Sequence, residues 1–277
     1  MNTFALELIF NIIGIGSASG LVYKDNILHI IGDNSGFLYE YRIDDESLNH
    51  HRLIENPSAN IAKNLKPEFE AIASDDHNIY VFGSGSTENR NKMVTIDKKS
   101  NAIIANTDLT NLYLSMQSFA NIKPDDFNIE GVVNEGKTWY FFQRGNGANG
   151  QNGVFTVEAE NLELDFAIVY NAFKLPKIKG VRASFTDATL VGNELYFLAT
   201  AENSKSTYLD GEILGSLIGN IDIGKMKIGK TKIISEKNKF EGLTLFAQNQ
   251  NQIEFLLCED NDTDFQESSI YKLTLKK

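Results

Sequence analysis

The chain has 277 residues, of which 42% are hydrophobic and 23% are charged, a balance that is ordinary for a globular protein. Its formal net charge of −11 argues against nucleic acid or an anionic membrane surface as the main partner. No apolar stretch reaches the roughly 18 residues of a membrane-spanning helix, and the single cysteine, Cys258, excludes an internal disulfide bond. We therefore expect a monomer whose partner is a small molecule, with neither nucleic acid nor a membrane involved.

The N-terminal stretch MNTFALELIFNIIGIG bears on the location of the protein. It lacks a basic n-region and a clear cleavage site, and it carries Glu7 within its apolar part. This pattern favours a cytoplasmic protein. Prior removal of an export signal would leave the same sequence, and a periplasmic or extracellular location would then follow.

Short apolar runs, rich in Ile, Val, Phe and Tyr and bounded by Gly, Asn and Asp, follow one another along the chain, which is typical of strands. The first two units read SGLVYKD, ILHIIGD, FLYEYRID, HHRLI and then EAIASDD, NIYVFGSG, KMVTID, AIIANTD. The next two read EGVVNEG, TWYFFQRG, GVFTVE, LDFAIVYNAF and then DATLVGN, ELYFLATAE, SLIGNIDI, KTKIISE. The fifth unit has only EGLTLFAQ, IEFLLCED and SIYKLTL. No segment shows helical periodicity over a dozen residues.

A marker residue opens each unit. Aligning Ser19, Glu70, Glu130, Asp187 and Glu241 gives steps of 51, 60, 57 and 54 residues. Four antiparallel strands repeated at this spacing predict an all-β fold, a β-propeller of five four-stranded blades, and residues 1–277 form one domain. The strand FALELIF at 4–10 has no unit of its own, so we expect it to complete the last blade and close the ring.

Two other architectures compete with this prediction. A β-sandwich with insertions does not explain the regular spacing of the marker. A sixth, degenerate blade within 100–128 or 200–225 is the main alternative.

The marker residues define a candidate site. In a propeller the first strand of each blade lines the central channel, and the loop after the second strand returns to the face where the first strand begins. The carboxylates of Glu70, Glu130, Asp187 and Glu241 should therefore meet at one channel mouth. Such a cluster persists only with raised pKa values, cationic partners or a bound metal ion.

An all-oxygen cluster is the ligand set of a hard cation, so Ca²⁺ is the expected cofactor, with Glu70, Glu130, Asp187 and Glu241 as its candidate ligands. The acidic run EDNDTDF at 259–265 could add one more ligand. A metal-assisted hydrolase would use Glu70 or Asp187 as its base and would act as a phosphoesterase, an esterase or a lactonase.

A small anionic or ester ligand of this site would be bound by nearby side chains. The candidates are Arg144 and Asp33, in loops after second strands, and Arg182, five residues before Asp187. In the alternative interpretation the Glu-Gly pairs only fix the strand openings, and the protein is a non-catalytic scaffold for a protein or a glycan.

The pattern SGLVYKDNILHIIGDNSGFLYEY, followed by FEAIA, IEGVV and FEGLTL, resembles bacterial propellers of the SdiA-regulated and phytase esterase-like group. The likeness spans nearly the whole chain and implies a propeller with calcium at the channel mouth. By this resemblance Glu70, Glu130 and Glu241 match the Glu-Gly positions, and Asp33 matches the acid that ends the second strand. The fourth unit departs from the pattern at Asp187-Ala188, which puts an equal contribution of all blades in doubt.

Overall fold

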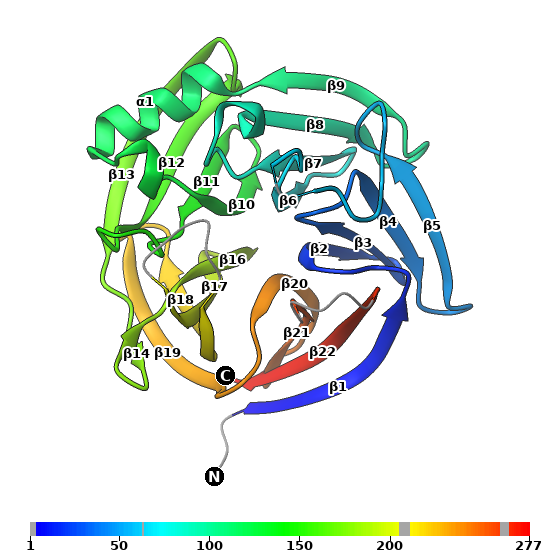
Figure 1. The fold of residues 1–277 in the computed structure, drawn as a ribbon. Coiled ribbons are helices and arrows are strands. Elements are labelled where there is room, and N and C mark those ends of the chain that lie inside the picture. Colours follow the sequence, from blue (N-terminus) through cyan, green and yellow to red (C-terminus); the bar gives the residue numbers. More distant parts are fainter. Residues whose placement is uncertain (1–3, 63, 205–210, 261–265) are drawn as a thin grey trace.

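The protein is described by a computed structural model that covers residues 4–62, 64–204, 211–260 and 266–277. Most of the acidic run at 259–265 therefore lies outside the described residues. The described chain forms five antiparallel sheets of four strands around a central axis, which confirms the predicted five-bladed propeller (Figure 1). Within the described chain, no helix has both the length and the apolar character needed to cross a membrane.

Blades 1 to 5 follow the order of the chain, and their bounds are as follows. Blade 1 contains β2 (Ala18–Lys24), β3 (Ile27–Gly32), β4 (Phe37–Arg42) and β5 (Ser47–Arg52), and blade 2 contains β6 (Phe69–Ser74), β7 (Asn78–Gly83), β8 (Lys92–Asp97) and β9 (Ile103–Asp108). Blade 3 contains β10 (Ile129–Glu135), β11 (Thr138–Gln143), β12 (Asn152–Asn161) and β13 (Asp165–Phe173), and blade 4 contains β16 (Ser184–Val191), β17 (Glu194–Asn203), β18 (Glu212–Asp222) and β19 (Lys227–Ser235). Blade 5 contains β20 (Phe240–Gln248), β21 (Gln252–Glu259), β22 (Glu267–Lys276) and β1 (Phe4–Ile13).

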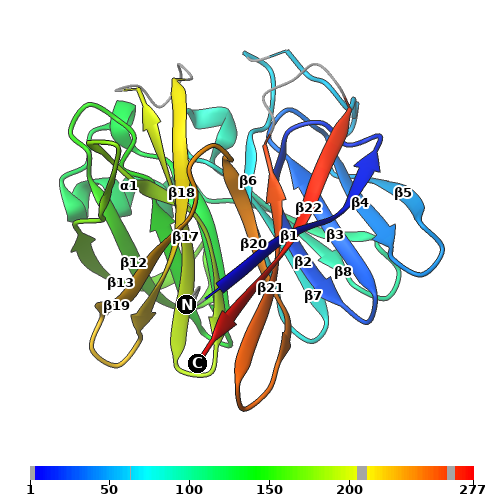
Figure 2. The same ribbon diagram turned by 90° about the horizontal axis from the view of Figure 1, so that it is seen from below.

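The N-terminal strand closes the ring, as the sequence predicted. β1 pairs antiparallel with β22, from Phe4 opposite Leu275 to Ile13 opposite Glu267. The two strands lie side by side at the edge of blade 5, in dark blue and red (Figures 1 and 2). Closure in this way pairs the two ends of the chain and leaves no gap in the ring between blades 5 and 1.

The first strands β2, β6, β10, β16 and β20 lie nearest the axis and contact their neighbours around it (Figure 1). Between the blades, buried aromatic and branched side chains form the core. Phe185, for example, meets Phe142 and Phe197 edge to face, with ring centroids 5.2 and 5.0 Å away. Such edge-to-face pairs stabilise the contact beyond the area they bury.

The segment between blades 2 and 3 corrects the prediction that the chain has no helix. Helix α1 (Thr110–Ala120) buries Leu112, Tyr113 and Met116 against the face of blades 2 and 3, and Tyr113 donates a hydrogen bond to the Gly83 carbonyl at 2.9 Å. With 11 residues, the helix is shorter than the dozen over which periodicity was sought. No sixth blade exists in the described chain, because 100–128 holds β9 and α1, and the described part of 200–225 belongs to β17 and β18.

Each first strand carries a β-bulge at the same place. The register shifts between Ala18 and Gly20, Phe69 and Ala71, Ile129 and Gly131, Phe185 and Asp187, and Phe240 and Gly242. The bulged residues are therefore Ser19, Glu70, Glu130, Thr186 and Glu241. Thr186, not Asp187, is the equivalent residue of blade 4, so the sequence alignment was wrong there by one position.

The residue after the bulge lies where neighbouring first strands come closest. A Cβ atom on Gly242 would lie 2.4 Å from Cys258 Sγ, 2.5 Å from Leu21 Cδ2 and 3.1 Å from Gly20 Cα. The glycine of the Glu-Gly pair thus has a packing function that is independent of its acidic neighbour.

We expect Gly242→Ala to lower the free energy of unfolding by about 1–3 kcal/mol, because the added methyl group overpacks this contact. Gly16→Ala is the matched control, since its Cβ would meet nothing within 4 Å, and it should change stability by less than about 0.5 kcal/mol. Urea unfolding of both variants measures the difference, and equal stabilities would contradict the packing argument.

Candidate functional site

The bulged residues divide into two chemical kinds. Ser19 Oγ donates to the Phe69 carbonyl at 2.6 Å, and Thr186 Oγ1 donates to the Phe240 carbonyl at 2.7 Å. In blades 1 and 4 the side chain therefore bonds to the residue that precedes the bulge of the next blade. In blades 2, 3 and 5 the bulged residue is a glutamate, and an ionised carboxylate cannot donate such a bond.

Arg144, directly after β11, pairs with three of the buried carboxylates at the channel mouth. Its Nη1 lies 3.0 Å from Glu130 Oε2 and 3.4 Å from Glu241 Oε1, and its Nη2 lies 2.9 Å from Glu202 Oε2. Burial opposes the charge of the guanidinium, but the three carboxylates outweigh it and raise the pKa of Arg144. One side chain thus connects blades 3, 4 and 5.

Two lysines from segments before the first strands complete these pairs. Lys239 Nζ lies 3.0 Å from Glu241 Oε1 and 2.7 Å from Asp260 Oδ2. Lys66 Nζ pairs with Asp33, and although burial opposes its charge, Asp33 and Glu70 raise its pKa. Both lysines precede the strand-opening acids in the sequence, in KFEG and KPEFE, and this signal could have revealed them.

Glu68 is held by several donors. Its Oε2 accepts from Ser84 Oγ at 2.6 Å, from Ser86 Oγ at 2.7 Å and from Arg90 Nη1, and Lys66 Nζ lies 3.5 Å from its Oε1. The sequence analysis missed Glu68 because only the second acid of EFEAIA aligns with the repeat.

These groups form one network, which we call the mouth cluster. Its described carboxylates are Asp33, Glu68, Glu70, Glu130, Glu202, Glu241 and Asp260, and its cations are Lys66, Arg90, Arg144 and Lys239. The described carboxylates outnumber the described cations. This excess of negative charge favours either protonation of some carboxylates or binding of a further cation.

Glu70 is the exception within the mouth cluster. Its side chain forms no hydrogen bond or ion pair with any other residue that the structure describes. Burial raises its pKa well above the ordinary range, and the carboxylates of Glu130, Asp33, Glu68 and Glu241 raise it further. Burial and these neighbours therefore favour the neutral form of Glu70 over the ionised form.

The pKa values of the two other glutamates of the ring are raised less than that of Glu70. Burial raises the pKa of Glu241 to about 8, against the opposing charge of Lys239. Burial also raises the pKa of Glu130, although Arg144 and Lys239 lower it. Cationic partners thus keep these two groups closer to ionisation than Glu70.

Asp187 lies one residue further along its strand than the bulge. It is only 2% exposed, and its Oδ2 accepts a hydrogen bond from the Leu243 backbone N–H at 2.6 Å. Its Oδ1 has no hydrogen-bond partner within the described part of the chain. Burial raises its pKa well above the ordinary range, with a smaller contribution from Glu130. Asp187 therefore links blades 4 and 5 through this hydrogen bond, and its burial favours the neutral form of the acid.

Arg182 lies outside the mouth cluster. It belongs to a separate hairpin of β14 (Lys177–Ile178) and β15 (Val181–Arg182), and its Nη1 donates to the Leu175 carbonyl at 2.7 Å. Arg144 is in the cluster but is held by three carboxylates, and Asp33 is paired with Lys66. The expected anion site of Arg182, Arg144 and Asp33 is thus not gathered in one place.

The expected calcium ligands fit the ion only in their chemistry. The carboxylates of the mouth cluster offer only oxygen atoms as metal ligands, and Ca²⁺ prefers oxygen ligands. Glu130 and Glu241, however, share Arg144, and Asp187 bonds to a backbone N–H. No group of three or more His, Cys, Asp or Glu side chains among the described residues is arranged to hold a metal ion. The four predicted ligands therefore do not form one coordination site.

Residues 14–275 match the model of a protein family that is described as a family of unknown function, DUF6929. The chain belongs to this family. A search of curated proteins finds no match.

Solved structures similar to this DUF6929 protein support the propeller fold. Glutaminyl cyclase of Myxococcus xanthus shares 12% identity with a TM-score of 0.54, covering 98% of this chain and 97% of that one. Regucalcin of Agrobacterium tumefaciens, titled a calcium-binding protein, shares 7% identity with a TM-score of 0.52, covering 99% and 94%. A luciferin-regenerating enzyme shares 10% identity with a TM-score of 0.51, covering 98% and 95%. Such low identities show the fold alone, and the narrower resemblance to SdiA-regulated and phytase esterase-like propellers is not confirmed.

We expect Arg144→Leu to lower the free energy of unfolding at pH 8 by about 3–5 kcal/mol, because it leaves three buried carboxylates without their partner. The loss should shrink at pH 5, because the raised pKa values of Glu130 and Glu241 allow protonation to remove their charge. Arg182→Leu, which gives up one bond to a backbone carbonyl, should lose only about 1 kcal/mol at either pH. Urea unfolding at both pH values tests this, and equal losses for the two variants would contradict the role of Arg144.

We expect Glu70→Gln to be more stable than the wild type at pH 8. A carboxyl with a raised pKa makes the folded state bind more protons than the unfolded state, so stability falls as the pH rises, by up to about 1.4 kcal/mol per pH unit. Glu70→Gln has no ionisable group at this position and does not lose stability in this way. Its advantage over the wild type in the free energy of unfolding should therefore disappear toward pH 5. Exposed Glu163→Gln is the control, and a gap that does not depend on pH would contradict the protonated state of Glu70.

Proposed function

We propose that the channel mouth binds a small cation and that Glu70 is its main contact. The observation that carries this proposal is the position of Glu70, a buried carboxyl surrounded by other carboxylates that makes no hydrogen bond or ion pair within the described residues, with Lys66 acting on it only at longer range. Strongly shifted groups of this kind are concentrated at functional sites.

Electrostatics supports a cation over an anion. The proton on Glu70 is the least expensive way to relieve repulsion in the mouth cluster when no ligand is bound. A bound cation would supply the same compensation and release that proton. An anionic ligand would meet an excess of carboxylates, so the anionic or ester ligand expected from the sequence requires the cation first.

Ca²⁺ is the first cation to test, because the carboxylates of the mouth cluster offer only oxygen ligands and Ca²⁺ accepts irregular coordination. The calcium-binding title of the regucalcin structure points to the same ion, although that likeness carries only the fold. A small organic ammonium ion would satisfy the same charge, and it is the second probe.

The hydrolase activity expected from the sequence rests on this binding. Glu70 has the raised pKa that suits a general acid, and Asp187 is a second buried acid nearby. Cleavage of a phosphate ester, a carboxylic ester or a lactone is therefore to be screened with whichever cation binds.

We expect Ca²⁺ added after EDTA treatment to raise the unfolding temperature, with a larger rise at pH 8 than at pH 6 because binding releases a proton. A ligand at a hundredfold excess over its dissociation constant stabilises the folded state by about 2.7 kcal/mol. Mg²⁺ and methylammonium are measured alongside, on the wild type, Glu70→Gln and the control Glu163→Gln.

Loss of the effect in Glu70→Gln alone would support the site. No stabilisation of the wild type by any of these cations would contradict the proposal. The carboxylates would then be structural, and the scaffold for a protein or a glycan would become the better interpretation.

A further inference from the structure

A polar groove of about 790 Å³ lies between the outer strands of blades 1 and 2, away from the mouth cluster. This volume falls within the range of small-molecule sites, about 300–1,000 Å³. Its polar lining includes His51, Arg52 and Glu55 from blade 1 and the segment after it, and Lys92, Asn101 and Asn106 from blade 2.

Lys92 begins β8 and faces blade 1. Strand alternation places it on the same face as Val94, which packs in one cluster with Ile31 and Leu38 of blade 1. Burial of its half-covered side chain lowers the pKa of Lys92, and no neighbouring carboxylate opposes that shift. The ammonium group thus loses hydration without gaining a partner.

The acids nearest to Lys92 are engaged elsewhere. Asp108 lies directly across the strand pair from Lys92 but accepts a hydrogen bond from the Thr110 N–H at 2.8 Å. Glu40 pairs with Arg42 at 2.9 Å and accepts a hydrogen bond from Asn101, a residue that lines the groove. Among the described residues, Lys92 itself forms no hydrogen bond or ion pair through its side chain.

The opposite wall offers further hydrogen-bond donors. His51, on β5, has its Nε2 3.3 Å from Glu40 Oε2. Asn106 contributes an amide from β9, on the same side of the groove as Lys92. Of the charged residues that line the groove, Glu55 is the one acid. Lys92 and Asn106 therefore lie across from β5 of blade 1, with a space between them that a ligand could enter.

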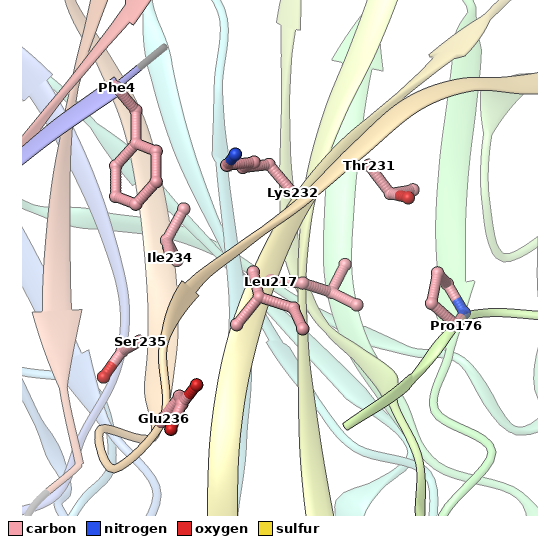
Figure 3. Close-up of a pocket in the computed structure, with 9 residues that line it drawn as sticks. Phe4, Pro176, Leu217, Thr231, Lys232, Ile234, Ser235 and Glu236 are labelled. Carbon is pink, nitrogen blue, oxygen red and sulfur yellow. The ribbon is translucent and has the colours of Figure 1, made fainter. Parts of the chain in front are cut away.

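A second groove, between blades 4 and 5, contains a lysine whose ammonium group has a partner (Figure 3). It has a volume of about 630 Å³, and its lining includes Lys232 and Glu236. Lys232 Nζ lies 5.7 Å from the centroid of the Phe4 ring, a cation–π contact. Its charge is thus met by an aromatic face.

We propose that the groove between blades 1 and 2 binds a small oxyanion of the kind that a phosphate group presents, with Lys92 as its main charged contact. The oxyanion restores the partner that the half-buried ammonium lacks, and the Asn106 amide is the donor available for a further oxygen atom. This proposal does not rest on the cation site at the channel mouth.

The test uses inorganic phosphate as the probe, titrated at constant ionic strength against sodium chloride and followed by the thermal unfolding temperature and by amide NMR shifts of β5, β8 and β9. The wild type should show saturable shifts. Lys92→Met keeps the apolar stem and should weaken the apparent affinity at least tenfold, while Lys92→Arg should retain binding. Lys232→Met, from the second groove, and Glu70→Gln, from the mouth, should bind phosphate like the wild type.

Three results would overturn the proposal. One is a wild type that responds to phosphate no more than to chloride. Another is a folded Lys92→Met variant that binds as tightly as the wild type. The third is a phosphate effect that disappears in Glu70→Gln, which would assign the binding to the channel mouth.

Discussion

The constraint on which the candidate site depends is the burial of more carboxylates than cations around the start of the first strands. Arg144 alone compensates Glu130, Glu202 and Glu241, and it does so across three blades. Breaking one partner of a buried pair leaves an uncompensated charge, which is far more destabilising than removal of an exposed pair. The ring is therefore held at this end by electrostatics as well as by packing, and Glu70, which has no direct ion pair among the described residues, has the most strongly disfavoured charge.

Much of the fold could be predicted from the sequence because the repeat has a backbone cause. Each blade opens with a bulge, and in blades 1, 2, 3 and 5 the bulged Ser or Glu is followed by a small residue, Gly or Ala, so this pair recurs along the chain. The same cause explains the error in blade 4. There the pattern is Phe185-Thr186-Asp187, and an alignment on acidic residues selects Asp187, whereas the bulge selects Thr186. Helix α1 was missed because three buried residues in a single short helix leave little periodicity to detect.

The candidate site was predictable in position but not in its pairing. First strands converge at one end of a propeller, so the acids were expected to meet there. Which cation meets which acid depends on loops and on segments before the strands, as Lys66, Lys239 and Arg144 show, and sequence spacing does not encode those distances. Net charge was no guide either, since the chain carries −11 overall yet holds an uncompensated lysine between blades 1 and 2.

The hydroxyl blades indicate why the acids matter. Ser19 and Thr186 occupy the same bulge as Glu70, Glu130 and Glu241, and each donates a hydrogen bond that joins its blade to the next. The fold can therefore be built with a hydroxyl at this position, and a hydroxyl would avoid the buried charge and the repulsion that raise the pKa values of the glutamates. A residue that lowers stability where a simpler one would serve is expected at functional positions. The glutamate of blade 2 meets this description best, because in the described structure its carboxyl forms no hydrogen bond or ion pair, and burial together with the neighbouring carboxylates disfavours its charge.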